Sequence, residues 1–135
     1  MSVLVDTTVW SELFRRTEPN AGIRNGLRLI LEQGEALIFG PIRQELLSGI
    51  KHPDQCERLR KRLRAFDDLA ILTEDYEEAA VMRNKCRSSG IQGSNTDFLI
   101  CAVAVRLSTP IFTLDQDFEL FARVLPIRLY DPSHA

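Results

Sequence analysis

Four acidic residues stand out because of where they fall relative to the apolar segments of the chain. Asp6 and Asp115 each directly follow a short, apolar, strand-like run. Glu45 lies one turn into an expected helix, and Asp97 opens the most apolar helix of the chain. In parallel α/β sheets, ligands bind beyond the carboxyl ends of the strands. The four carboxylates are therefore predicted to meet in one cleft, with Asp117 as a further candidate close behind Asp115.

Carboxylates that meet in one cleft repel one another and raise one another's pKa. A divalent metal ion relieves that repulsion, and a ligand set made only of oxygens favours a hard ion such as Mg²⁺ or Mn²⁺ over zinc. The two histidines, His52 and His134, are expected at the surface rather than as ligands. The chemistry that suits a carboxylate-held Mg²⁺ is hydrolysis of a phosphodiester by a metal-activated water, without a covalent nucleophile.

Each of these acids also has a purely structural interpretation. Asp97 completes the capping-box sequence Ser94-Asn95-Thr96-Asp97, and Asp115 suits the N-cap of the helix that follows it. Glu45 alone is typical of a solvated helix position. Asp6 is the hardest to explain by structure alone, because a carboxylate buried at a strand end is costly without a partner.

The elements that must position these acids alternate along the chain. Strands are expected at residues 2–6, 35–39, 70–72, 111–113 and 127–130. Helices are expected at residues 7–14, 21–32, 40–49, 53–66, 75–87, 96–107 and 117–124. This alternation predicts an α/β fold with a central, mostly parallel sheet of four to five strands flanked by helices.

Length and composition fit a single globular domain over residues 1–135. With 44% hydrophobic and 27% charged residues, the chain does not have the composition of a disordered protein. The longest apolar run, residues 98–105, is far too short to span a membrane, and no secretory signal is recognised. A cytoplasmic protein without a membrane anchor is expected. The cysteines (Cys56, Cys86 and Cys101) form neither a disulfide framework nor a zinc pattern.

Charge is distributed unevenly, although the net charge is only −2. Residues 1–64 hold 11 Lys and Arg against 8 Asp and Glu, whereas residues 65–135 hold 6 against 11. Five cations fall within seven residues of one expected helix, namely Arg58, Arg60, Lys61, Arg62 and Arg64. One interpretation is a solvated helix face, and the other is contact with the phosphates of an RNA backbone.

Four segments together resemble the signatures of PIN-domain ribonucleases, and most of all those of VapC-type toxins from toxin–antitoxin pairs. The segments are VLVDTTVW at residues 3–10, PIRQELLSG at 41–49, TDFLICA at 96–102 and TLDQDF at 113–118. No single segment is specific. Their order, their spacing and their places at strand or helix ends are specific together, and the resemblance covers essentially the whole chain.

The resemblance implies a PIN-like three-layer fold and an Mg²⁺-dependent endoribonuclease in which Mn²⁺ substitutes for Mg²⁺. It implies an RNA substrate, either tRNA or another structured RNA. It also implies a small cognate antitoxin of the VapB type, homodimerisation, and a toxin–antitoxin hetero-oligomer.

The resemblance also assigns roles to individual residues. Asp6 and Asp97 match the principal metal ligands, and Glu45 matches the third acid. Asp115 and Asp117 both lie in the fourth segment, and Asp115 is preferred as a metal ligand because it is nearer the strand end. Three hydroxyl side chains are expected to orient the carboxylates or a phosphate, namely Thr7, Thr8 and Thr113.

Two other functions compete with this hypothesis. A haloacid-type phosphatase would need a second Asp two residues after Asp6, where this chain has Thr8, and the acidic pair of a phosphoacceptor domain is not visible. A non-catalytic interaction module on the same fold would most simply be signalled by the loss of an acid, yet all four acidic places are filled.

Overall fold

A sheet of three parallel strands runs through the centre of the computed structural model, which describes residues 1–14 and 20–134. The strands are β1 (Val3–Val5), β2 (Ala36–Leu37) and β3 (Ile111–Phe112), in the order β2-β1-β3. Leu4 lies in register with Leu37 on one side and Ile111 on the other. All of β1 is buried, as the apolar sequence of a central parallel strand requires.

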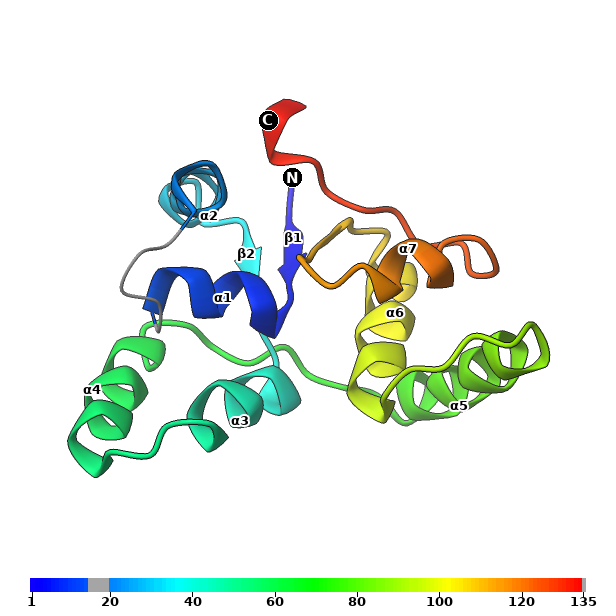
Figure 1. Cartoon of the computed structure of the whole chain (residues 1–135), viewed down its shortest axis with the longest axis horizontal. Coiled ribbons are helices and arrows are strands. Elements are labelled where there is room, and N and C mark those ends of the chain that lie inside the picture. The colour runs from blue at the N-terminus through cyan, green and yellow to red at the C-terminus, as the bar shows by residue number, and fades with distance from the viewer. Residues whose placement is uncertain (15–19, 135) are drawn as a thin grey trace.

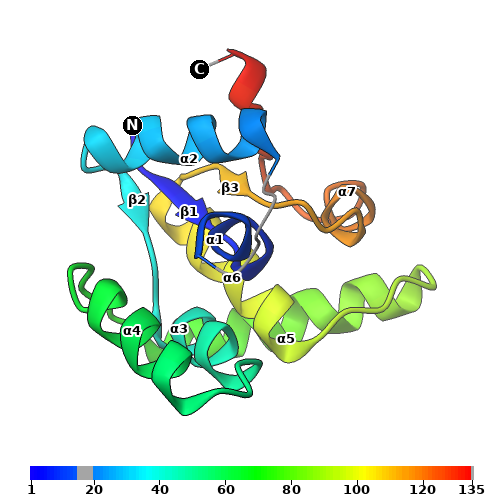
Figure 2. The same ribbon diagram turned by 60° about the vertical axis from the view of Figure 1, so that its left-hand side comes forward.

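Helices cover both faces of this sheet. They are α1 (Thr7–Phe14), α2 (Ala21–Glu32), α3 (Gly40–Ser48), α4 (Pro53–Leu63), α5 (Thr73–Ser88), α6 (Asn95–Leu107) and α7 (Asp117–Phe121), followed by the 3₁₀ turn η1 (Pro132–His134). Figures 1 and 2 show β1 between α1 and α2 on one side and α6 on the other. Helices α3, α4 and α5 lie beyond the end of the sheet toward which β1 points (Figure 1). The predicted three-layer α/β arrangement is confirmed.

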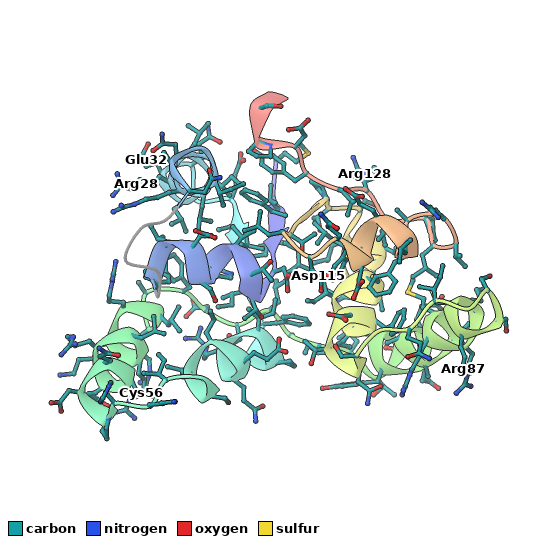
Figure 3. The ribbon with its side chains drawn as sticks, viewed as in Figure 1. Arg28, Glu32, Cys56, Arg87, Asp115 and Arg128 are labelled. Carbon is teal, nitrogen blue, oxygen red and sulfur yellow. The ribbon has the colours of Figure 1, made fainter. Side chains whose placement is uncertain are left out.

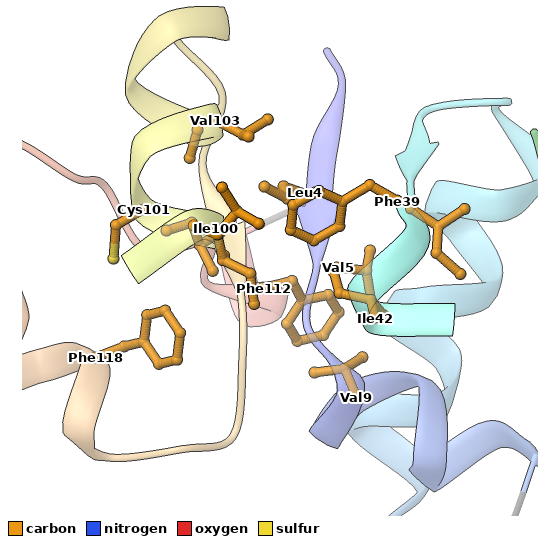
Figure 4. Close-up of a cluster of buried hydrophobic side chains, with 14 of the residues drawn as sticks. Leu4, Val5, Val9, Phe39, Ile42, Ile100, Cys101, Val103, Phe112 and Phe118 are labelled. Atoms are coloured by element: carbon orange, nitrogen blue, oxygen red, sulfur yellow. The ribbon is translucent and has the colours of Figure 1, made fainter. Parts of the chain in front are cut away.

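The core includes buried apolar side chains from β1 and from every helix from α1 to α7, and α6 contributes most to it. Every residue from Phe98 to Ala104 is buried, which explains why this helix is apolar on nearly all sides. Figure 4 shows Ile100 and Val103 of α6 on one side of Leu4, with Phe39 on the other. Cys101 is fully buried in the same helix, and burial raises the pKa of its thiol, so that it is a packing residue and not a nucleophile. Within the described residues, no helix has both the length and the apolar character needed to cross a bilayer.

Two of the predicted strands, at residues 70–72 and 127–130, are wrong, because neither segment forms a regular strand. Residues 70–72 form none: the backbone N–H of Leu72 donates to the Asp75 carboxylate at the start of α5, and the Leu72 side chain is exposed. The parallel bridge to Ile38 forms earlier, at Asp68. Residues 127–130 reach the sheet only through a bridge between Leu129 and Ile111. The described sheet therefore has three strands rather than four or five, with one isolated bridge beyond each edge strand.

The helix boundaries differ from the predictions by a few residues. Helix α4 ends at Leu63 and not at 66, α5 begins at Thr73 and not at 75, and α7 ends at Phe121 and not at 124. Among the predicted site residues on these three helices, the shifts affect only Arg64, which becomes the C-cap of α4 instead of lying within the helix.

Candidate active site

Asp6 lies at the carboxyl end of β1, where its side chain is only 5% exposed. The backbone N–H of Asp6 donates to the Phe112 carbonyl at 2.9 Å, which fixes this strand end against β3. Two hydroxyls hold the side chain: Thr8 Oγ1 and Thr113 Oγ1 each donate to Asp6 Oδ2 at 2.8 Å. Among the hydrogen bonds of the described residues, none ends on Asp6 Oδ1. This buried carboxylate thus has a fixed orientation and one oxygen left for another ligand.

The same two threonines also accept hydrogen bonds from the backbone of the segment that follows β3. Thr8 Oγ1 accepts the backbone N–H of Leu114 at 3.0 Å, and Thr113 Oγ1 accepts that of Asp115 at 3.0 Å. Asp115 Oδ1 in turn accepts the backbone N–H of Asp117 at 2.9 Å. The N-cap of α7 is Gln116 and not Asp115, the residue expected from the sequence, but the Asp115 carboxylate one residue earlier still binds the first backbone N–H of the helix.

Glu45 reaches the site from α3. Thr7 Oγ1 donates to Glu45 Oε1 at 2.9 Å, so the first residue of α1 ties the two helices together at this point. Burial raises the pKa of the Glu45 carboxyl, and the nearby charges of Asp6 and Asp97 raise it further, while the Thr7 hydrogen bond lowers it.

Asp97 is the third residue of α6 and closes the predicted capping box. Its Oδ2 accepts the backbone N–H of Ser94 at 3.0 Å, and its own N–H donates to Ser94 Oγ at 3.1 Å. Burial raises the pKa of this carboxyl, the Ser94 hydrogen bonds lower it, and the charges of Asp115 and Asp6 raise it again. Capping a helix and belonging to an acidic site are therefore compatible roles for Asp97.

The structure brings acids from four elements into electrostatic contact, which are Asp6, Glu45, Asp97 and Asp115. None of the ion pairs between described residues involves any of these four side chains. Within the described residues, no ion pair therefore offsets the negative charge of this partly buried cluster.

An ion with oxygen ligands fits the chemistry of this donor set. In the described part of the chain, however, no three His, Cys, Asp or Glu side chains are arranged so that they would hold a metal ion as they stand. The carboxylates are near enough to raise one another's pKa, yet they have not closed around a single point.

Two predicted groups lie outside this cluster. Asp117 begins α7, and no described interaction connects its side chain with the other acids. The cations of α4 lie beyond α3, at the end of the molecule opposite α5, as Figures 1 and 2 show. There the Arg62 guanidinium lies 4.5 Å from the centre of the Phe14 ring, and Arg60 pairs with Glu57. An open pocket of about 500 Å³ runs beside Arg58 and Arg62.

Sequence reasoning missed two arginines that line one pocket between α5 and α6. Arg83 and Arg87 project from α5 at the turn that leads into α6, and Arg83 Nη1 donates to Asn95 Oδ1 at 3.0 Å. The available signal was their spacing of four residues on a helix, which places both side chains on one face.

Comparison with known proteins gives matches that extend over most of the chain. The family model described as the PIN domain matches residues 3–124. The chain is 30% identical over 124 residues to VapC ribonuclease Mb1587 of Mycobacterium bovis and to Ribonuclease VapC11 of Mycobacterium tuberculosis. Each of these alignments covers 90% of this chain and 92% of the relative.

Solved structures share the fold at lower sequence identity. FitAcB from Neisseria gonorrhoeae has a TM-score of 0.78 at 23% identity, covering 98% of this chain and 99% of that chain. VapBC2 from Rickettsia felis, bound to a DNA fragment from their promoter, has a TM-score of 0.78 at 18% identity, covering 96% and 98%. A toxin–antitoxin complex from Klebsiella pneumoniae has a TM-score of 0.69 at 22% identity, covering 97% and 98%.

Proposed function

Because this chain belongs to the PIN domain family, we propose that it is a metal-dependent endoribonuclease and the toxin of a type II toxin–antitoxin pair. The observation that carries the proposal is the cluster of four carboxylates from distant parts of the sequence, gathered at one end of a parallel sheet without a partner cation among the described residues. The curated relatives carry the name ribonuclease, which supports RNA as the substrate.

Four residues would hold the metal ion, namely Asp6, Glu45, Asp97 and Asp115. Bound Mg²⁺, or Mn²⁺ in its place, would supply Lewis-acid polarisation of a phosphoryl oxygen and a lower pKa for a bound water. The uncompensated charge of the cluster supports this assignment, because a dication would lower the repulsion that raises the pKa of Glu45 and Asp97. Asp117 is kept only as an accessory acid.

The protein's own contribution is to hold these oxygens before the substrate arrives. Thr8 and Thr113 hold Asp6 Oδ2, which leaves Oδ1 directed to other ligands. Thr7 holds Glu45, and Ser94 holds Asp97. Hydroxyl and amide donors restrain the carboxylates without neutralising their charge, which keeps the full negative potential available to a cation.

The proposed substrate is tRNA or another structured RNA. The cations of α4 are proposed to contact the RNA backbone away from the acids, namely Arg58, Arg60, Lys61, Arg62 and Arg64. A carboxylate cluster repels phosphates, so a separate basic surface suits a nuclease that must hold a polyanion beside its own acids.

The proposed partner is a VapB-type antitoxin that blocks the site, within a hetero-oligomer built on a toxin homodimer in the cytoplasm. Support comes from the similar solved structures, one of which is named as a toxin–antitoxin complex and another as VapBC2 on promoter DNA. These proteins match nearly the whole chain, so the shared fold extends over all the surfaces described above.

The test uses purified full-length protein freed of antitoxin and a bulk tRNA substrate. Cleavage is expected with Mg²⁺ or Mn²⁺ and is expected to stop on addition of EDTA. Asp6→Asn is expected to reduce the rate by more than about 100-fold, the upper range for loss of a partner that merely orients a metal ligand. Asp67→Asn, at an exposed position, is the matched control. Cleavage that persists in EDTA, or in Asp6→Asn, would refute the proposal.

A further inference from the structure

A small pocket lies where α5 turns into α6. It has a volume of about 230 Å³ and is lined by Arg83, Arg87, Ile91, Gln92 and Gly93. Gly93 has a packing reason to be glycine: a Cβ atom there would lie 2.5 Å from the Phe121 ring. The backbone at Gly93, which forms one side of the pocket, therefore packs closely against the core.

The two arginines of this pocket are positioned by neutral groups. Arg83 Nη1 donates to Asn95 Oδ1 at 3.0 Å, and Arg87 Nη2 donates to Asn84 Oδ1 at 2.9 Å. Neither arginine takes part in an ion pair with a described residue. An amide oxygen orients a guanidinium without cancelling its charge, and several of its five N–H donors stay available. Arg106, on the neighbouring helix, contrasts with them because it is neutralised by Asp75.

The pocket and the carboxylate cluster are connected by the residues that lead into α6. Gly93 directly precedes Ser94, whose backbone N–H and hydroxyl both bond Asp97. Asn95, the partner of Arg83, is the first residue of α6 and stands two residues before Asp97. Side chains two residues apart on a helix do not face each other, and Figure 3 shows Arg87 on the outer part of α5, away from Asp115. The two arginines therefore form a cationic site of their own at the turn between α5 and α6.

We propose that Arg83 and Arg87 form a phosphate-binding pocket that holds the RNA backbone at the turn between α5 and α6. The inference rests on the proposed ribonuclease function and adds a substrate subsite to it. A guanidinium pair matches the planar, bidentate geometry of phosphate oxygens, which is why arginine is preferred for this recognition. The pocket would give the RNA a cationic contact separate from the α4 surface.

The test measures RNA binding without cleavage. Wild-type protein and the double variant Arg83→Gln/Arg87→Gln are titrated in EDTA against a fluorescein-labelled stem–loop RNA at several salt concentrations. The double variant is expected to bind about tenfold more weakly, and its plot of log K against log salt is expected to be less steep by about 2, because two phosphates are no longer neutralised by the protein. Arg83→Lys/Arg87→Lys is expected to recover most of the slope.

Lys85→Gln is the matched control, because it removes one positive charge from an exposed position of the same helix outside the pocket. Thermal melting of every variant verifies that it is folded. Equal behaviour of the control and the double variant would overturn the inference. It would also be overturned if the double variant kept RNA binding and bound the antitoxin less tightly, because the pocket would then be a protein-binding surface. Failure of the wild type to cleave RNA with Mg²⁺ would instead refute the proposed function.

Discussion

Two aspartates of this protein occupy the same local motif and have opposite surroundings. Asp75 is the third residue of α5 and accepts the backbone N–H of Leu72 at 2.9 Å. Asp97 is the third residue of α6 and accepts the backbone N–H of Ser94 at 3.0 Å. Each carboxylate thus accepts the N–H of the residue just before its helix, although only Asp97 has a hydroxyl, Ser94 Oγ, that accepts its own N–H in return.

The side chains that surround the two carboxylates are different. Asp75 is 2% exposed, and Arg106 donates to both of its oxygens, at 2.7 Å and 3.0 Å. Burial acts to raise the pKa of Asp75, but the hydrogen bonds from Arg106 and Leu72 bring that pKa below its ordinary value. Burial also raises the pKa of Asp97, yet there the neighbouring charges are Asp115 and Asp6, which raise it further.

The difference separates an acid that stabilises the fold from one that remains available for function. Asp75 is neutralised by an arginine and thereby fastens the start of α5 to the end of α6. Asp97 has no ion-pair partner among the described residues and lies beside other acids, where the proposed dication would be its partner. A buried carboxylate with a fixed cation indicates a structural role, and one surrounded by like charge indicates a functional site.

Replacing each aspartate by asparagine is expected to have the largest effects. One variant should lose RNA cleavage and keep its stability, and the other should lose stability and keep RNA cleavage. Asp97→Asn should lower metal-dependent RNA cleavage by more than about 100-fold, while the metal-free melting temperature stays level or rises because repulsion is relieved. Asp75→Asn should leave Arg106 without its partner and lower the free energy of unfolding by about 3 kcal/mol. RNA cleavage per folded molecule should then be retained.

Cleavage assays and urea denaturation in EDTA measure the two effects separately. If Asp97→Asn were destabilised as strongly as Asp75→Asn, the carboxylate of Asp97 would be a structural cap. The two acids would then have the same role in the protein.

Removing the hydroxyls around Asp6 is expected to have an intermediate effect. Thr8→Val and Thr113→Val each delete one of the two donors to Asp6 Oδ2. Loss of such an outer partner should weaken Mn²⁺ or Mg²⁺ binding about 10- to 100-fold. Titration calorimetry measures that affinity directly, and Thr8→Ser and Thr113→Ser, which keep the hydroxyl, are the controls. Unchanged metal affinity in both valine variants would show that Asp6 needs no orienting donor.

The smallest expected effect is a dependence of stability on pH. The pKa of Glu45 is raised in the folded protein above its ordinary value of 4.5, so the folded state holds this proton more tightly than the unfolded chain. Metal-free wild type should therefore lose stability relative to Glu45→Gln as the pH rises from below 4.5 through the folded pKa. Above that pKa the difference should be constant, and saturating Mg²⁺ should remove or reverse it.

Melting temperatures in EDTA and in Mg²⁺, measured from about pH 4 to about pH 8, check this prediction. The exposed Glu32, labelled on α2 in Figure 3, provides Glu32→Gln as the control. A melting difference between wild type and Glu45→Gln that does not change with pH would mean that the neighbouring acids do not act on Glu45.

Much of the fold could be predicted because its elements have strong local signals. The seven helices were expected within a few residues, since apolar periodicity, Gly40-Pro41 and the Ser94 capping box mark them locally. The outer strands could not be predicted correctly. Residues 70–72 are apolar enough for a strand, but Arg106 donates to the Ala70 carbonyl and Asp75 accepts the Leu72 N–H. Those contacts come from segments distant in sequence or from the helix that follows, and they use the groups that a strand would need.

The candidate site, like the fold, could be predicted from the sequence only in part. The sequence by itself determined which acids follow strands or lie early in helices, because residue type and local pattern are enough to place Asp6 and Asp115 after strands, Asp97 at a helix start and Glu45 one turn into a helix. It also determined Thr7, Thr8 and Thr113 as nearby hydroxyls. Only the tertiary structure decided which charges face one another: that Asp75 has Arg106, that Asp97 has no such cation among the described residues, and that Arg83 and Arg87 line one pocket. Charge interactions act through space within a few ångströms, and the fold alone determines which side chains come that close.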